Sequence, residues 1–168
     1  PRRPARRSPP VPGAAGVAPA AQVPGAAPAA AAAAPRERIQ VKTDVLNVTL
    51  DAEGGSLVKS EFAKFADKAD KDKHFILMDE SKDRFYVAQT GLIGGAFPTH
   101  KTLMKVSGDL ELRDGQDELV VKFESPDMGG VKLVKTYTFK RGSYAMAVRH
   151  DVVNTGTVPV SPQLYLQL

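Results

Sequence analysis

The segment from Val131 to Asn154 limits the possible folds more than any other part of this chain. Two runs of alternating apolar and polar residues flank the pair Arg141-Gly142. An alternation with a period of two residues is typical of a strand with one buried face, and a glycine permits the positive φ that a short hairpin loop requires. The segment therefore predicts a long β-hairpin.

The apolar side chains of each run share one face of this hairpin, although Val134 and Lys135 interrupt the alternation. An isolated hairpin is only marginally stable in water, so both faces need a second layer to cover them. We therefore expect a β-sandwich in which both strands pack on one core. The predicted core-facing residues are Val131, Leu133, Tyr137 and Phe139 in the first run, and Tyr144, Met146, Val148 and Val152 in the second.

Shorter runs of the same kind occupy most of the chain after residue 38. Residues 39–51 change the phase of their alternation near Thr43-Asp44-Val45, which predicts two short strands or one strand with a bulge. Further predicted strands span residues 74–78 and 85–90, which form a second hairpin around a turn at 79–83, and residues 103–106, 117–124 and 158–168. Loops are predicted at residues 91–102, 109–116 and 125–130.

Residues 60–71 fit two different structures. Phe62, Phe65 and Ala69 have the spacing of one helix face, and Ala, Lys and Glu favour helices. The alternative is a strand through residues 57–65 that is followed by a charged, solvated loop at residues 67–73. We favour the strand.

Residues 1–38 have a composition that cannot form a core. They contain 14 Ala and 9 Pro with almost no large apolar side chain, which predicts a disordered, semi-extended linker ahead of a folded domain at residues 39–168. Six arginines lie in this linker, whereas the remaining residues carry 17 basic and 18 acidic side chains. The folded part therefore lacks the positive charge that nucleic-acid binding requires.

The chain has no cysteine, which excludes disulfide bonds and the common zinc sites that use cysteine. It contains no run of about 18 apolar residues that could span a membrane. It begins without Met or a signal-peptide pattern and ends inside the predicted strand at residues 158–168. We therefore expect an excised or processed piece of a domain that continues further.

The histidines are the main candidates for chemistry. His74, His100 and His150 lie far apart in sequence and lack the spacings of metal ligands, so we expect no metal site. His150 and Glu124 could act as an acid and a base if their strands were neighbours, but a partly buried, structural His150 is favoured.

The remaining motifs also lack the parts of an active site. Residues 91–95 are glycine-rich, but no phosphate-binding loop follows and Lys101 does not have Walker spacing. We therefore predict no catalytic, cofactor-binding or metal-binding residues. The charged residues 64–73 are interpreted as solvated, and the edge near residues 158–168 is the better candidate for contact with another protein.

Three segments carry a family resemblance. They are residues 41–55 (VKTDVLNVTLDAEGG), 75–94 (FILMDESKDRFYVAQTGLIG) and 137–156 (YTFKRGSYAMAVRHDVVNTG). In order and spacing they resemble the large periplasmic domain of the YidC membrane protein insertases of Gram-negative bacteria. The similarity runs from about Ile39 to Leu168.

The resemblance implies a β-supersandwich related to galactose mutarotase, with two packed, mostly antiparallel sheets that are incomplete in this chain. It also implies that a transmembrane helix precedes the linker, that the domain faces the periplasm at the bacterial inner membrane, and that insertase activity resides in a membrane core outside this chain.

We therefore expect a non-enzymatic accessory and interaction domain without a cofactor. By resemblance it would aid the insertion and folding of inner-membrane proteins, with or without the Sec translocon, and its partners would be Sec components and nascent membrane proteins. The alternative is a carbohydrate-binding or mutarotase-like β-sandwich, which would need a His and a Glu that converge on a sugar.

Overall fold

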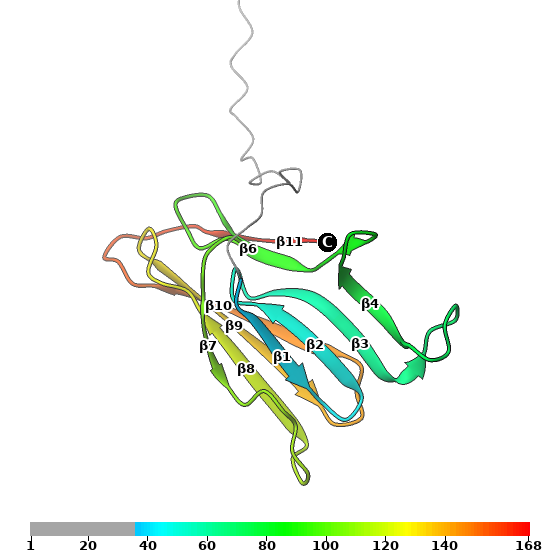
Figure 1. Ribbon diagram of the computed structural model, residues 1–168. Helices are drawn as coiled ribbons and strands as arrows, with labels where there is room; N and C mark the ends of the chain where they lie inside the picture. The colour runs from blue at the N-terminus through cyan, green and yellow to red at the C-terminus, as the bar shows by residue number, and fades with distance from the viewer. Residues whose placement is uncertain (1–35) are drawn as a thin grey trace, which may run out of the picture.

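The structure is a computed structural model that describes residues 36–168, and every regular element in this part of the chain is a β-strand, as predicted (Figure 1). The strands are β1 (Arg38–Lys42), β2 (Leu46–Asp51), β3 (Ser56–Ala66), β4 (His74–Glu80), β5 (Phe85–Tyr86), β6 (Gln89–Ile93), β7 (Lys105–Gly108), β8 (Glu118–Glu124), β9 (Val131–Lys140), β10 (Met146–Asn154) and β11 (Gln163–Gln167). Within residues 36–168 there is no helix long and apolar enough to cross a membrane. The predicted linker at residues 1–38 lies outside the described residues except for its last three.

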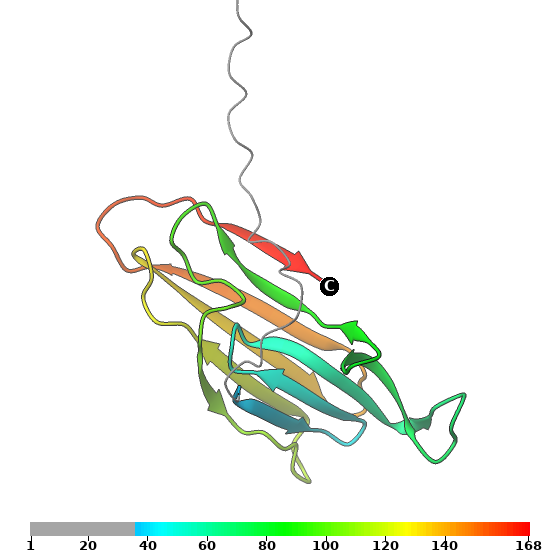
Figure 2. The same cartoon turned by 45° about the horizontal axis from the view of Figure 1, so that its top comes forward.

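The strands form antiparallel sheets that face one another. The first sheet has the order β1-β2-β3-β4-β5, the second has the order β10-β9-β8-β7, and β11 pairs with β6 in a small third sheet. Figures 1 and 2 show β1 to β3 lying across β8 to β10. One apolar core fills the space between them with side chains such as Val41, Leu50, Phe123 and Phe139. The prediction of an all-β sandwich is confirmed.

The long hairpin is confirmed as β9 and β10, which pair along the whole length of β10. Gly142 has a φ of 70° in the turn between them. The burial predicted for the second strand is partly wrong, because Val148 and Val152 face the core side opposite Tyr137 and Leu133 but are 42% and 43% exposed. The reason is that β10 is the edge strand of its sheet, and the described elements leave this margin uncovered.

The interruption predicted at Val134 and Lys135 is wrong. Burial alternates without a break along β9, so Lys135 lies on the core face with Leu133 and Tyr137. The charge that a lysine head group carries in water argues against a place on this face. The four-carbon stem of the side chain, however, packs like an apolar side chain.

The predictions for residues 39–73 are confirmed. β1 and β2 are two strands joined at Thr43, whose Oγ1 accepts the N–H of Leu46 at 2.9 Å. β3 is a strand, so the helical alternative for residues 60–71 is wrong. The charged loop that follows is closed by the N–H of Asp67, which donates to the carbonyl oxygen of Lys73 at 2.7 Å.

The predicted strand at residues 85–90 is divided into β5 and β6, and only two residue pairs join β4 to β5. The loop predicted from residue 91 is wrong at its start, because β6 continues to Ile93. A Cβ atom on Gly91 would lie 2.5 Å from the hydroxyl oxygen of Tyr165. This glycine therefore marks a close approach of β11 rather than a loop. Strand β7 begins two residues later than predicted, whereas β8 agrees closely with its prediction.

Candidate functional site

The three histidines lie in separate places, and each has its own hydrogen-bond partner. The pairs are His74 Nδ1 with Glu61 at 2.8 Å, His100 Nδ1 with Tyr165 at 2.5 Å, and His150 Nε2 with Thr90 at 2.7 Å. No group of three potential metal ligands comes together within residues 36–168. The structure therefore does not gather the histidines into one site.

The acid–base pair considered for His150 and Glu124 does not form. His150 lies opposite Lys135 in the β9–β10 ladder, and Lys135 lies opposite Phe123 in the β8–β9 ladder. Glu124 is the next residue along β8, so its side chain points to the other face of the sheet. There it accepts a hydrogen bond from Lys132 Nζ at 2.8 Å.

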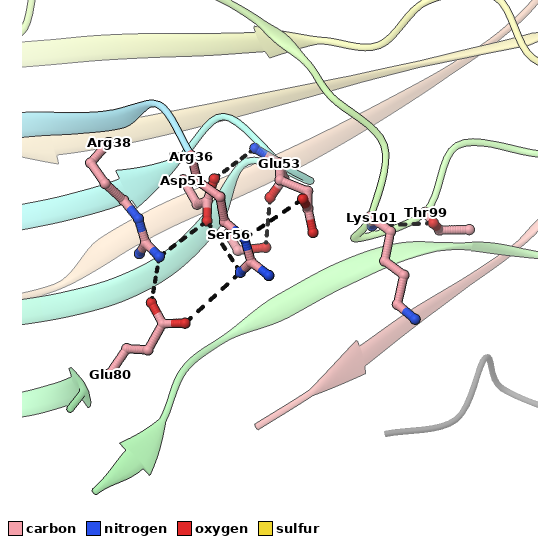
Figure 3. A network of polar contacts seen from close by, with 8 residues as sticks. All are labelled: Arg36, Arg38, Asp51, Glu53, Ser56, Glu80, Thr99 and Lys101. Carbon is pink, nitrogen blue, oxygen red and sulfur yellow. Dashed lines mark hydrogen bonds and ion pairs between the residues drawn. The ribbon is translucent and has the colours of Figure 1, made fainter. Parts of the chain in front are cut away.

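The glycine-rich segment likewise forms no phosphate-binding loop. Its first residue, Gly91, belongs to β6. Lys101 is exposed in a turn where its backbone N–H donates to Thr99 Oγ1 at 3.2 Å, as Figure 3 shows.

The most unusual side chain is one that the sequence analysis did not select, Lys135. It is fully buried, and its Nζ atom donates to the carbonyl oxygen of Thr90 at 2.8 Å and to the carbonyl oxygen of Gly54. Burial lowers the pKa of Lys135 to about 7. A signal was present in the sequence, because Lys135 occupies the apolar parity between Leu133 and Tyr137.

Two histidines near this lysine also have lowered pKa values. Burial is the main cause of the lowered pKa of His150, the positive charge of Lys135 adds to it, and Asp151 partly opposes it. Burial is also the main cause of the lowered pKa of His100, with smaller effects from Lys101 and Lys135. The interior around Lys135 therefore favours neutral side chains.

A second polar cluster lies where the described chain begins (Figure 3). The carboxylate of Asp51 is almost completely buried and accepts the N–H of Glu53 at 2.8 Å. Arg38 Nη2 lies 3.5 Å from this carboxylate and 2.6 Å from Glu80, and Arg36 lies 3.8 Å from Asp51. The cluster fastens the start of β1 to β2 and β4, which is a structural role.

An open groove of about 770 Å³ lies beside β7, the edge strand of the second sheet. Leu103, Met104 and Pro126 give it an apolar floor, and Leu103 is 69% exposed. Its charged groups are two lysines and one glutamate, so the groove carries a net positive charge. The lining residues are Leu103, Met104, Lys105, Ser107, Glu124, Ser125, Pro126 and Lys132.

Two further surfaces could meet a partner. An aromatic cluster lies where β3 ends and β4 begins, next to the turn between β9 and β10. It includes Phe62, Phe65, Phe75 and Tyr144, and Phe65 is 52% exposed. The strand predicted at residues 158–168 forms only at Gln163–Gln167, as β11, so its predicted start is five residues too early. β11 pairs with β6 on one side and has no partner strand on its other side within residues 36–168.

Comparisons with known proteins agree with the motifs. The family model described as the YidC periplasmic domain matches residues 38–168. A relative from Aromatoleum aromaticum is 43% identical over 139 residues, which cover 82% of this chain and 25% of the relative. Relatives from Bordetella parapertussis and Burkholderia thailandensis are each 44% identical, cover 81% and 77% of this chain, and are matched over 24% of their own length. All three carry the name membrane protein insertase YidC, and the chain spans about a quarter of their length.

Proposed function

The chain belongs to the YidC periplasmic domain family, and from this we propose that it is an accessory interaction domain of a membrane protein insertase. In this role it faces the periplasm at the bacterial inner membrane and is tethered there by segments outside this chain. It has no chemistry of its own. It assists the insertion and folding of inner-membrane proteins, with nascent membrane proteins and components of the Sec translocon as partners. The observation that carries the proposal is the family match across residues 38–168.

The groove beside β7 is the surface on which we expect a partner to bind. An edge strand has unpaired backbone groups that accept an additional strand, and the apolar floor at Leu103 and Met104 accepts apolar side chains. Lys105 and Lys132 both lie near the single Glu124, so an acidic residue in the partner gains a cationic neighbour. The occupant is therefore an extended segment of a protein that carries apolar residues beside an acidic one.

The first test removes residues 39–168 from the full-length insertase in cells that depend on it. We expect slower insertion of membrane proteins, measured by protease accessibility of newly made substrates. Unchanged insertion of every substrate would contradict the accessory role.

A second test addresses the groove itself. Leu103→Asp places a charge on the apolar floor and should weaken cross-linking to the partner severalfold. Phe85→Asp is the matched control, because Phe85 is 65% exposed, close to the 69% of Leu103, but lies on β5 away from the groove. Equal effects of the two substitutions would contradict the assignment of the groove.

A further inference from the structure

Lys135 connects three parts of the fold through one nitrogen atom. Its backbone belongs to β9 in the second sheet, while its Nζ atom donates to Gly54 in the turn between β2 and β3 and to Thr90 in β6. The chain therefore uses a polar contact in the core where the facing sheets and the small third sheet meet.

The hydrogen bonds match a neutral amine. A protonated lysine has three N–H donors, whereas a neutral amine has two. Two carbonyl oxygens accept hydrogen bonds from the Nζ atom. Burial is the cause of the lowered pKa of Lys135, and no carboxylate lies beside this side chain among residues 36–168. An ammonium at this position would be a buried charge without a counter-ion, which is strongly unfavourable.

His150 attaches to the same residue of β6. Its Nε2 atom lies 2.7 Å from Thr90 Oγ1, while the carbonyl oxygen of Thr90 receives Lys135. Because Lys135 and His150 are paired across β9 and β10, a proton on either one repels a proton on the other. Both Lys135 and His150 can therefore stay bound to Thr90 without charge repulsion only when at least one of them is neutral.

The other titratable groups nearby do not neutralise this charge. His100 and Lys101 in the segment after β6 are both basic, and Tyr165 of β11 is hydrogen-bonded to His100. On β9, Tyr137 donates to the Gly55 carbonyl at 2.6 Å. β8 presents Phe123 opposite Lys135. Asp151, which follows His150, binds Arg149, and Asp51, three residues before Gly54, faces two arginines.

We propose that Lys135, His150 and Thr90 form a proton-controlled latch, which holds β6 and β11 on the sandwich while Lys135 and His150 are neutral and releases these two strands as the two groups become protonated. The strands that move are the small third sheet, and their other attachments include the backbone bridge between Leu57 and Ala88 and the buried side chain of Leu92. The proposal does not depend on the function proposed above.

The direction of the effect follows from proton linkage. The pKa of Lys135 is about 7 in the closed state and returns towards its ordinary value of 10.5 when the side chain reaches water. Between these values the open state binds one more proton, so each fall of one pH unit favours opening by about tenfold. Below pH 7 the contribution of Lys135 is constant, and the lowered pKa of His150 extends the effect into more acidic solution.

Hydrogen exchange of the full-length insertase measures this opening directly. After correction for intrinsic exchange rates, we expect the protection of amides in β6 and β11 to rise about eightfold between about pH 7.5 and about pH 8.5, with no comparable change in β8. Lys135→Met, which keeps the length of the side chain without a titrating group, should abolish this rise. Lys140→Met is the control, because Lys140 is exposed on the same strand and should leave the rise unchanged.

A second variant keeps the test decisive if Lys135→Met does not fold. His150→Gln retains a hydrogen-bonding side chain next to Thr90 and should remove the response below about pH 6.5 while preserving the rise above pH 7. Wild-type protection of β6 and β11 that does not depend on pH would overturn the latch. The same pH response in Lys135→Met as in the wild type would also overturn it.

Discussion

Lys135 and His150 face each other across β9 and β10, and both side chains end on Thr90 of β6. One residue of the small third sheet is therefore held by two groups that both gain positive charge in acid. Their joint position places a polar contact in the interior of the sandwich, and we expect this contact to make the stability of the domain depend on pH.

The first prediction concerns the pH dependence of unfolding. Burial lowers the pKa of Lys135 from 10.5 to about 7, so the unfolded chain binds more protons than the folded chain between these values. The free energy of unfolding should therefore rise as the pH rises above about 7, by roughly 1 kcal/mol per pH unit. Below about pH 7 Lys135 is protonated in both states, so it should add no further pH dependence. Urea unfolding of the complete periplasmic domain at several pH values measures the slope, and Lys135→Met should remove it. A flat profile for the wild type would contradict the burial of an uncompensated lysine.

The sequence predicted the strands whose alternation has a simple physical cause. β8 and β9 bury alternate residues in the centre of the second sheet, so apolar residues alternate along both strands except at Lys135, and the predicted bounds are close to those observed. The pattern also identified β10, but it did not reveal that Val148 and Val152 would be exposed. Burial depends on what faces the strand, and the sequence of one strand does not contain that information.

The predicted interruption at Lys135 and the predicted loop at Gly91 are wrong for related reasons. Each is a residue type that is usual in loops or on surfaces, and each lies in the interior because of a distant partner. Lys135 requires the carbonyl groups of Gly54 and Thr90, which are 81 and 45 residues away. At Gly91 the hydroxyl group of Tyr165 leaves no space for a Cβ atom, so a glycine is required. Contacts between such distant segments cannot be derived from local spacing.

The second prediction concerns the hydroxyl group of Tyr165. It accepts the backbone N–H of His100 at 3.0 Å and lies 2.5 Å from His100 Nδ1, all in a buried position. Tyr165→Phe removes both contacts and leaves two polar atoms of His100 without this partner, so we expect a loss of about 1 to 3 kcal/mol in the free energy of unfolding. Tyr144→Phe is the control, because its ring packs among aromatic side chains in a half-buried position. Equal losses for the two variants would contradict the role of the Tyr165 hydroxyl.

The third prediction concerns space at Gly91. A Cβ atom there would lie 2.5 Å from the Tyr165 hydroxyl oxygen and 2.8 Å from the Cα atom of Thr99. The second neighbour is backbone and cannot rotate away, so Gly91→Ala should push β11 or the Thr99 turn outwards and cost about 1 to 3 kcal/mol. Gly156→Ala is the control, because its nearest neighbour is the Asn154 side chain at 3.5 Å, an ordinary contact. Thermal unfolding of both variants measures the difference, and an unaffected Gly91→Ala would show that β11 does not pack as closely as described.

The last prediction concerns Arg38, which lies between the buried carboxylate of Asp51 and Glu80. Arg38→Ala leaves Asp51 with the more distant Arg36 as its remaining cationic neighbour among residues 36–168. Because Arg38 is one-third exposed, solvent screens part of the loss, and we expect a decrease of about 1 to 2 kcal/mol in the free energy of unfolding.

The same cluster distinguishes a buried partner from a surface ion pair. Lys42→Ala is the matched control for Arg38→Ala, because it removes a cation from the other end of β1 whose partner, Glu111, is 3.9 Å away and 66% exposed. Exposed pairs of this kind contribute about 0 to 1 kcal/mol, so urea unfolding should find Lys42→Ala close to the wild type. If Arg38→Ala also behaves like the wild type, then water solvates Asp51 well enough to replace the arginine. If Asp51→Asn then restores the stability lost in Arg38→Ala, the loss came from the unpaired carboxylate and not from the missing arginine stem.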